Sequence, residues 1–161
     1  MKIVLIILII LLSYYIGFYY KNRQIEKYKL LCYLKNYSIN LKTNINLFKN
    51  NFVKVTDDFI ELQDKKTAKF NNIFEKKCDI YKINDKFIDI FDFYEQDSVI
   101  IKTFLNSIGN NEYEYENIRI NEFITFLDKK IEEYSMYVKT KGELTLKLTI
   151  AIGCVISIII W

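Results

Sequence analysis

The apolar residues of this chain are concentrated at its two ends. Ile3 to Tyr20 is a run of 18 residues without a charge. As a helix, this run would span about 27 Å, close to the roughly 30 Å hydrocarbon core of a bilayer. The last stretch, Leu144 to Trp161, carries one charge, Lys147, near its start, where the long stem of a lysine reaches the headgroups. Both ends therefore predict membrane-spanning helices.

Each terminal segment also has a soluble alternative. The first could be a cleaved signal peptide, but no small-residue cleavage site follows its apolar core, and the aromatic residues at its end are typical of a membrane interface. The second could be the core helix of a soluble domain, because only 14 residues follow Lys147. Its isoleucines cover every face rather than one stripe, which favours contact with lipid.

Basic residues flank both apolar segments on the side facing the middle of the chain: Lys21, Arg23, Lys27 and Lys29 after the first, and Lys139, Lys141 and Lys147 before or within the second. The positive-inside rule then places the middle in the cytoplasm and both termini outside. From Lys21 to Lys54 there are eight basic residues against one acidic residue, which indicates attraction to anionic headgroups. Nucleic-acid binding is the weaker alternative, since no nucleic-acid-reading motif occurs among these lysines.

The middle of the chain follows a helical period. Apolar positions recur at alternating steps of three and four, as in helices packed side by side. One series is Leu30, Leu34, Tyr37, Leu41, Asn44 and Phe48. The other is Ile120, Ile124, Leu127, Ile131, Tyr134 and Val138. Both series are too short for a free coiled coil, so we expect the two helices to pack on each other as an antiparallel stem, each continuous with its apolar segment.

Shorter helices are expected between the two stem helices. Thr56 is placed to cap one of them, and residues 68–77 predict another. Asp97 or Ser98 begins a third helix, which ends before Gly109. Period-two alternation does not persist long enough to predict a sheet.

The closely spaced apolar residues from Phe87 to Tyr94 have two interpretations. They form core in a small helical head, which we favour, or an exposed surface for a partner. The predicted fold is all-α, with two terminal transmembrane helices continuous with an antiparallel helical stem and a small helical head. The corresponding segments are residues 1–20, 21–143 and 144–161.

Composition argues against catalysis and metal binding. The chain has no histidine, which removes the commonest general base and every Ser-His or Cys-His nucleophile. Its three cysteines show no CxxC or zinc spacing. Acidic residues cluster in 85–97 and 112–116, with the spacing of a solvated helix face and without that of an EF-hand. We expect no catalytic residue, no metal site and no cofactor.

The most distinctive part of the sequence is FLNSIGNNEYEYENIRINEFITFLDKKIEEY, from Phe104 to Tyr134, followed from Lys139 by KTKGELTLKLTIAIGCVISIIIW. A helix ending in Ile108-Gly109, a polar turn, a long charged helix and an apolar terminal segment come in that order. In this order the segment resembles the stage III sporulation protein AB family, which is similar to the cytoplasmic domain of the type II secretion platform F proteins. Thr149 stands where the family usually has glycine.

Two sets of site residues are expected, the first from its position far from the bilayer, where a cytosolic partner could reach. A partner-facing set lies in the turn at the distal end of the last stem helix: Gly109, Glu112 and Glu116, the last in place of the family's usual glutamine. A plain helix–helix connection is the alternative for this turn. A set for packing in the membrane spans comprises Gly17, Leu148 and Gly153.

The family further implies a function without chemistry of its own. The chain would be a membrane scaffold of the secretion-like channel complex that links the mother cell to the engulfed forespore, located in the mother-cell membrane around the forespore. Its partners would be the sporulation-specific secretion-type ATPase, other channel-complex subunits and the lipid bilayer, with no nucleic acid. The alternative is a generic two-span membrane-anchored adaptor unrelated to sporulation.

Overall fold

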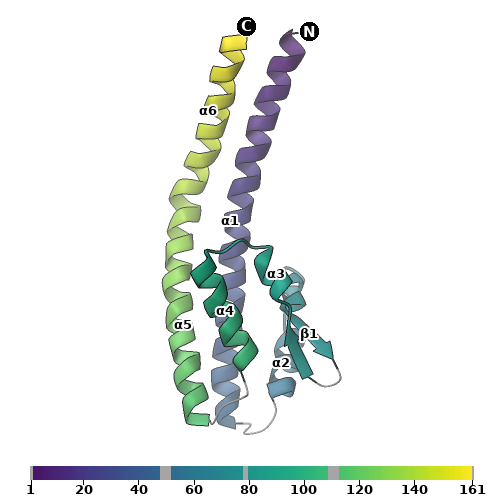
Figure 1. Ribbon diagram of the computed structural model, residues 1–161, viewed down its shortest axis with the longest axis vertical. Helices are drawn as coiled ribbons and strands as arrows, with labels where there is room; N and C mark the ends of the chain where they lie inside the picture. The colour runs from purple at the N-terminus through teal and green to yellow at the C-terminus, as the bar shows by residue number, and fades with distance from the viewer. Residues whose placement is uncertain (1, 48–51, 78–79, 109–112, 161) are drawn as a thin grey trace. The chain divides into compact units, whose positions relative to one another are not determined.

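The computed structural model describes residues 2–47, 52–77, 80–108 and 113–160 (Figure 1). Over these residues the chain is mostly helical and its one sheet is a short hairpin, so the all-α prediction is confirmed. It divides into two compact units. The first joins Met1–Tyr28 to Ile131–Trp161, and the second is Lys29–Lys130.

Helix α1 (Lys2–Leu47) runs without a break through the first apolar segment and the stem helix predicted after it. This stretch contains no proline and a single glycine, so no residue in it forces a kink or an end. The predicted seam is fully buried in the second unit at Leu30, Leu34, Tyr37 and Leu41. Asn44 is half-buried, and Phe48 lies outside the described residues. At the other four positions, the steps of three and four predicted both the helix and its packed face.

Short elements follow α1 in the second unit (Figure 1). In chain order they are α2 (Phe52–Glu61), the 3-10 helix η1 (Ala68–Ile73), β1 (Phe74–Lys77), β2 (Ile80–Ile83), α3 (Asp85–Asp89) and α4 (Glu95–Ser107). The long helix α5 (Tyr113–Met136) comes next, and the π-helical turn η2 (Tyr137–Lys141) and α6 (Gly142–Ile160) complete the chain in the first unit.

Aromatic side chains make the core of the second unit. The Tyr33 ring lies edge-on to Phe59, with centroids 5.3 Å apart, and tilted against Phe70 at 5.5 Å. Tyr37 contacts the same Phe59 ring at 5.1 Å. Burying a side chain of this size contributes about 1.5–3 kcal/mol, and such ring pairs add about 0.5–1.5 kcal/mol. This cluster fastens α2 and η1 to α1.

A second aromatic contact joins α4 to α5. The rings of Phe104 and Phe123 stack with centroids 3.8 Å apart, and both side chains are buried. An ion pair in the same unit joins α1 to α5, with Lys35 Nζ 2.5 Å from Asp128 Oδ1. Together these contacts hold α5 beside α1 and α4.

The helix predicted for residues 68–77 is wrong in its second half, and so is the absence of a sheet. β1 pairs with β2 antiparallel, and Phe74 stands opposite Ile83. Both of these side chains are buried, and the Phe74 ring lies 4.7 Å from that of Tyr37. Because strand preference depends strongly on what a residue packs against, this tertiary contact outweighs the local pattern.

Two predicted helix starts also differ. Thr56 lies inside α2 rather than at its cap, and its hydroxyl donates to the Phe52 carbonyl over 2.9 Å. α4 begins at Glu95, ahead of the predicted Asp97 or Ser98. Asp97 sits instead in the first turn of α4, where a carboxylate is favourable.

The apolar residues between Phe87 and Tyr94 divide between the two predicted roles. Ile88 is fully buried, and the Phe91 ring lies 6.0 Å from that of Phe70, so these residues are core. Ile90 and Tyr94 are exposed. α3 and the turn after it therefore contribute to the core through Ile88 and Phe91, while Ile90 and Tyr94 face outward.

Candidate functional site: the packed apolar helices

Two helical stretches are long and apolar enough to cross a membrane, Lys2–Asn44 and Glu114–Ile159. Their apolar residues point outward: in residues 3–20 and 144–159 the exposed large hydrophobic side chains have relative accessibilities between 42% and 78%. Soluble monomers rarely expose large contiguous apolar patches, which favours contact of these side chains with an apolar medium. By length and composition, both could therefore be membrane spans.

Small residues make the contact between the two apolar helices in the first unit. A Cβ placed on Gly17 would meet the Oγ1 of Thr149 and come within 3.2 Å of the Leu146 Cα. A Cβ on Gly153 would meet the hydroxyl of Ser13 and come within 2.7 Å of the Ser13 Cβ. The residue number rises along α1 while it falls along α6, so the helices are antiparallel. Both glycines are buried because the helices approach too closely for any larger residue.

The hydroxyls on α6 at this contact are satisfied within their own helix. Thr149 donates to the carbonyls of Thr145 (3.1 Å) and Leu146 (2.9 Å). Ser157, which is buried, donates to the Gly153 carbonyl over 2.8 Å. An apolar medium offers no water to such groups, so bonds of this kind make a small hydroxyl tolerable there.

The structure brings Gly17 and Gly153, predicted for packing, into the same contact between α1 and α6. Ser13 and Thr149 are the partners that the sequence reasoning did not predict. Their signal was present, since small residues recur every fourth position at Ser13 and Gly17 and at Thr149, Gly153 and Ser157. This spacing is typical of closely packed helices in membranes.

Leu148 lies elsewhere: it is exposed. The series Ile131, Tyr134 and Val138, continued at steps of three and four, would bring residues 141, 145, 148 and 152 to the packed face. The π-helical turn η2 contains one residue more than an α-helical turn, which shifts this register by one. Gly142, Thr149 and Gly153 consequently face α1, and Leu148 faces outward.

The predicted partner-facing turn is described only at its end, because Gly109 and Glu112 lie outside the described residues. Glu116 is buried near the start of α5, with its Oε2 3.9 Å from Arg119 Nη1. Arg119 also donates to the Ser107 carbonyl over 3.4 Å and to the Ser107 hydroxyl. Arg119 thus links the start of α5 to the end of α4, and Glu116 lies next to this link.

One charged cluster lies outside the apolar helices. Lys76 Nζ is 2.7 Å from Asp57 Oδ2, and the Tyr81 hydroxyl donates to Asp57 Oδ1. These two hydrogen bonds hold the pKa of the Asp57 carboxyl below its usual range. The cluster joins α2 to the hairpin, and within the described part of the chain no group of three or more Cys, Asp or Glu side chains is placed to hold a metal ion.

Comparison with known proteins identifies a family over the whole chain. The family model of stage III sporulation protein AB matches residues 2–161. Neither a curated protein nor a solved structure matches the chain.

Proposed function

The chain belongs to the stage III sporulation protein AB family, and from this premise we propose that it is a membrane scaffold of the secretion-like channel complex that links the mother cell to the forespore. In this role it performs no chemistry and holds its partners at the mother-cell membrane around the forespore. The observation that carries the proposal is the first unit, in which two apolar helices bury small residues against each other and direct large apolar side chains outward.

The proposal places both apolar helices across the bilayer and the second unit in the cytoplasm. Its support is the distribution of charge: residues 3–20 carry none, and basic residues follow at Lys21 and Arg23. Lys139 and Lys141 precede the other apolar segment in the same way. Lys and Arg remain on the cytoplasmic side of spans, so both termini would lie outside.

The secretion-type ATPase and other channel-complex subunits are the proposed partners, and the turn at Gly109–Glu116 is the proposed contact. Because Glu116 is buried, it would not contact the partner directly, and its role would be to stabilise the turn. Co-purification of the full-length chain with the ATPase from sporulating cells tests this partner. A chain with Glu112→Ala would retain less ATPase than a chain with Glu122→Ala, which changes an exposed acid of α5 outside this turn.

The test of the proposed function is deletion of the gene in its host, with spore formation followed by microscopy. Arrest after engulfment is the expected result, with recovery when the intact gene is restored. A gene carrying Gly17→Leu with Gly153→Leu should fail to restore spores, because the helices could no longer close on each other. A gene carrying Ile16→Leu with Ile152→Leu, which changes exposed neighbours, should succeed.

Normal spores after deletion, with no second copy of the gene, would contradict the channel role. A generic two-span adaptor outside sporulation would then explain the same architecture.

A further inference from the structure

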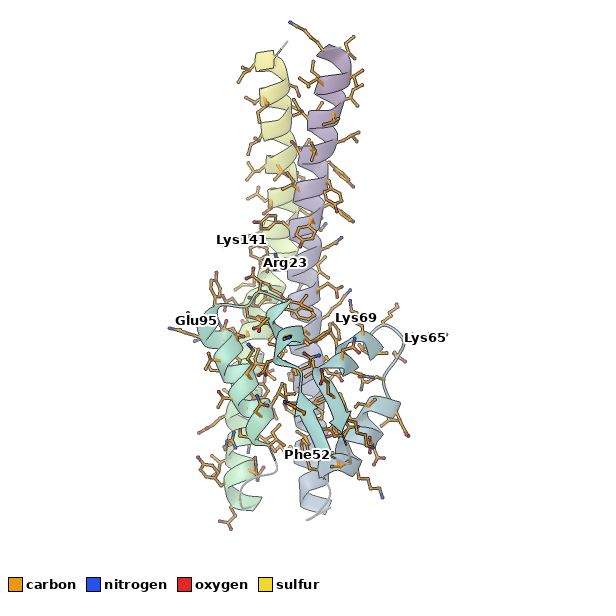
Figure 2. The ribbon with its side chains drawn as sticks, turned by 45° about the vertical axis from the view of Figure 1, so that its right-hand side comes forward. Arg23, Phe52, Lys65, Lys69, Glu95 and Lys141 are labelled. Atoms are coloured by element: carbon orange, nitrogen blue, oxygen red, sulfur yellow. The ribbon has the colours of Figure 1, made fainter. Side chains whose placement is uncertain are left out.

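Basic side chains form a layer across both helices of the first unit, at the border of their apolar segments. We call this the basic layer: Lys21 and Arg23 on α1, and Lys139 and Lys141 in η2. Figure 2 shows Arg23 and Lys141 at similar heights on the two neighbouring helices. The layer is thus built from positions more than a hundred residues apart in the sequence.

A close approach of the helices aligns the layer. Gly142 is buried, and a Cβ placed on it would lie 3.6 Å from the Lys21 Cγ. The stem of Lys21 therefore lies over the first residue of α6, next to the end of η2. At this distance a Cβ would make an ordinary van der Waals contact, so Lys21 and Gly142 are neighbours across the two helices.

The π-helical turn decides which way the lysines of the second helix point. In an uninterrupted helix, the steps of three and four that lead through Tyr134 and Val138 would place Lys141 on the face packed against α1. The extra residue of η2 puts Gly142 on that face, and Lys139 and Lys141 are exposed. Such single π turns inside long helices occur frequently at functional sites.

Basic residues outnumber acids in the first unit. The unit has seven basic residues against four acids, Glu26, Glu132, Glu133 and Glu143. Among the residues next to the apolar segment of α6, Glu143 is the acid and Lys147 adds a positive charge. The layer therefore lies in a unit with net positive charge, beside the apolar surface of both helices.

We propose that the basic layer binds the headgroups of anionic phospholipids, whose phosphodiester oxygens accept hydrogen bonds from the lysines of η2. The inference rests on the proposed insertion of both helices in a bilayer, and it adds a lipid preference with a defined site. Two features favour a lipid over a soluble anion: the positive side chains directly border exposed apolar side chains, and a phospholipid supplies both chemistries in one molecule.

The experiment uses the full-length protein reconstituted in vesicles of phosphatidylglycerol and phosphatidylcholine in equal parts. Extraction with a styrene–maleic acid copolymer then yields the protein with its surrounding lipids, which are quantified by mass spectrometry. The unmodified protein should retain phosphatidylglycerol above its share in the vesicles. A chain with Lys139→Gln and Lys141→Gln should lose most of this enrichment, since each juxtamembrane lysine changes anionic-lipid binding about fivefold.

The matched control is a chain with Lys65→Gln and Lys66→Gln, two exposed lysines of the second unit. It carries the same loss of charge and should keep the enrichment. Equal enrichment in the unmodified chain and the η2 variant would overturn the inference, and so would an equal loss in the control. Displacement of the lipid by millimolar inorganic phosphate would also overturn it, because the layer would then be a site for free phosphate.

An alkaline carbonate wash of the vesicles separates failure of the inference from failure of the proposed function. Protein that remains in the washed vesicles but shows no lipid preference contradicts the lipid site alone. Protein released by the wash contradicts the membrane spans themselves, and with them the scaffold proposal.

Discussion

Gly153 on α6 lies directly against Ser13 on α1, so closely that a Cβ on the glycine would come within 2.7 Å of the serine Cβ. One turn along, a Cβ on Gly17 would meet the Thr149 Oγ1 and come within 3.3 Å of the Thr149 Cβ. Two apolar helices gain little from the hydrophobic effect when their surroundings are lipid, so close packing of small residues has to supply the attraction. This contact makes the apolar helices a pair.

Ser13→Cys combined with Gly153→Cys should form a disulfide under mild oxidation. The Cβ–Cβ separation in a disulfide is usually about 3.8 Å. The two Cβ atoms would lie 2.7 Å apart, so the helices would have to separate slightly for the bond to form. The three natural cysteines are first replaced by serine, and maleimide–polyethylene glycol labelling on gels counts the remaining thiols. The pair Leu12→Cys and Ile152→Cys, on exposed faces of the same helices, should stay reduced.

Gly153→Leu should lower the thermal stability of the purified chain in detergent. The added side chain has to push α1 and α6 apart, and overpacking of this kind costs about 1–3 kcal/mol. Circular dichroism during heating measures the change. Ile152→Leu adds no volume at an exposed neighbouring position and should melt as the unmodified chain does; an equal loss in both variants would contradict the assigned packing face.

Tyr37→Phe should destabilise the second unit by about 1 kcal/mol. The Tyr37 hydroxyl lies 3.0 Å from Thr56 Oγ1, and both side chains are fully buried. Since the Thr56 hydroxyl donates to the Phe52 carbonyl, Tyr37 is the donor of the pair. Urea unfolding monitored by circular dichroism measures the loss, and Tyr94→Phe, at an exposed tyrosine, should show none.

Asp57→Asn should destabilise the chain at neutral pH and have little effect in acid. The pKa of Asp57 is lowered in the folded chain by hydrogen bonds from Lys76 and Tyr81, so the carboxylate contributes stability above the ordinary aspartate pKa of about 3.9. This contribution is lost as the pH falls through the lowered folded pKa. The group is partly exposed, which limits the effect to roughly 0.5 kcal/mol.

Melting temperatures of the unmodified and Asp57→Asn chains, taken at intervals from neutral to acid pH, test this dependence. The two curves should converge below the ordinary aspartate pKa. Tyr81→Phe should weaken the dependence, whereas Asp58→Asn, at the exposed neighbouring acid, should leave it intact. A constant difference between the Asp57→Asn and unmodified chains at every pH would contradict the assigned hydrogen bonds.

The long helices were predictable because their signals are local and repeated. Steps of three and four through Leu30, Leu34, Tyr37 and Leu41 fall on one face of any α-helix, whatever else the chain does. The same holds for the uncharged segment from Ile3 to Tyr20, whose length alone matches a bilayer. In both cases the sequence pattern directly expresses what the structure needs: an apolar face for packing, or an apolar length that matches the bilayer.

The hairpin and the true start of α2 were not predictable in this way. Phe74 and Ile83 are strand residues because their side chains are buried in the second unit, where Phe74 meets the Tyr37 ring. Tyr37 lies almost forty residues before Phe74 in the sequence, and no local pattern carries that contact. Thr56 is of a residue type that often caps helices, but it lies within α2 and its hydroxyl donates to the Phe52 carbonyl.

By itself, the sequence determined the two apolar ends, the excess of positive charge beside them and the packed seam of the stem helices. It also held the small residues every fourth position that allow α1 and α6 to approach closely. Only the tertiary structure decided which face of α6 carries that contact. The reason is the single extra residue of η2, which turns Gly142, Thr149 and Gly153 inward and leaves Lys141 and Leu148 outside.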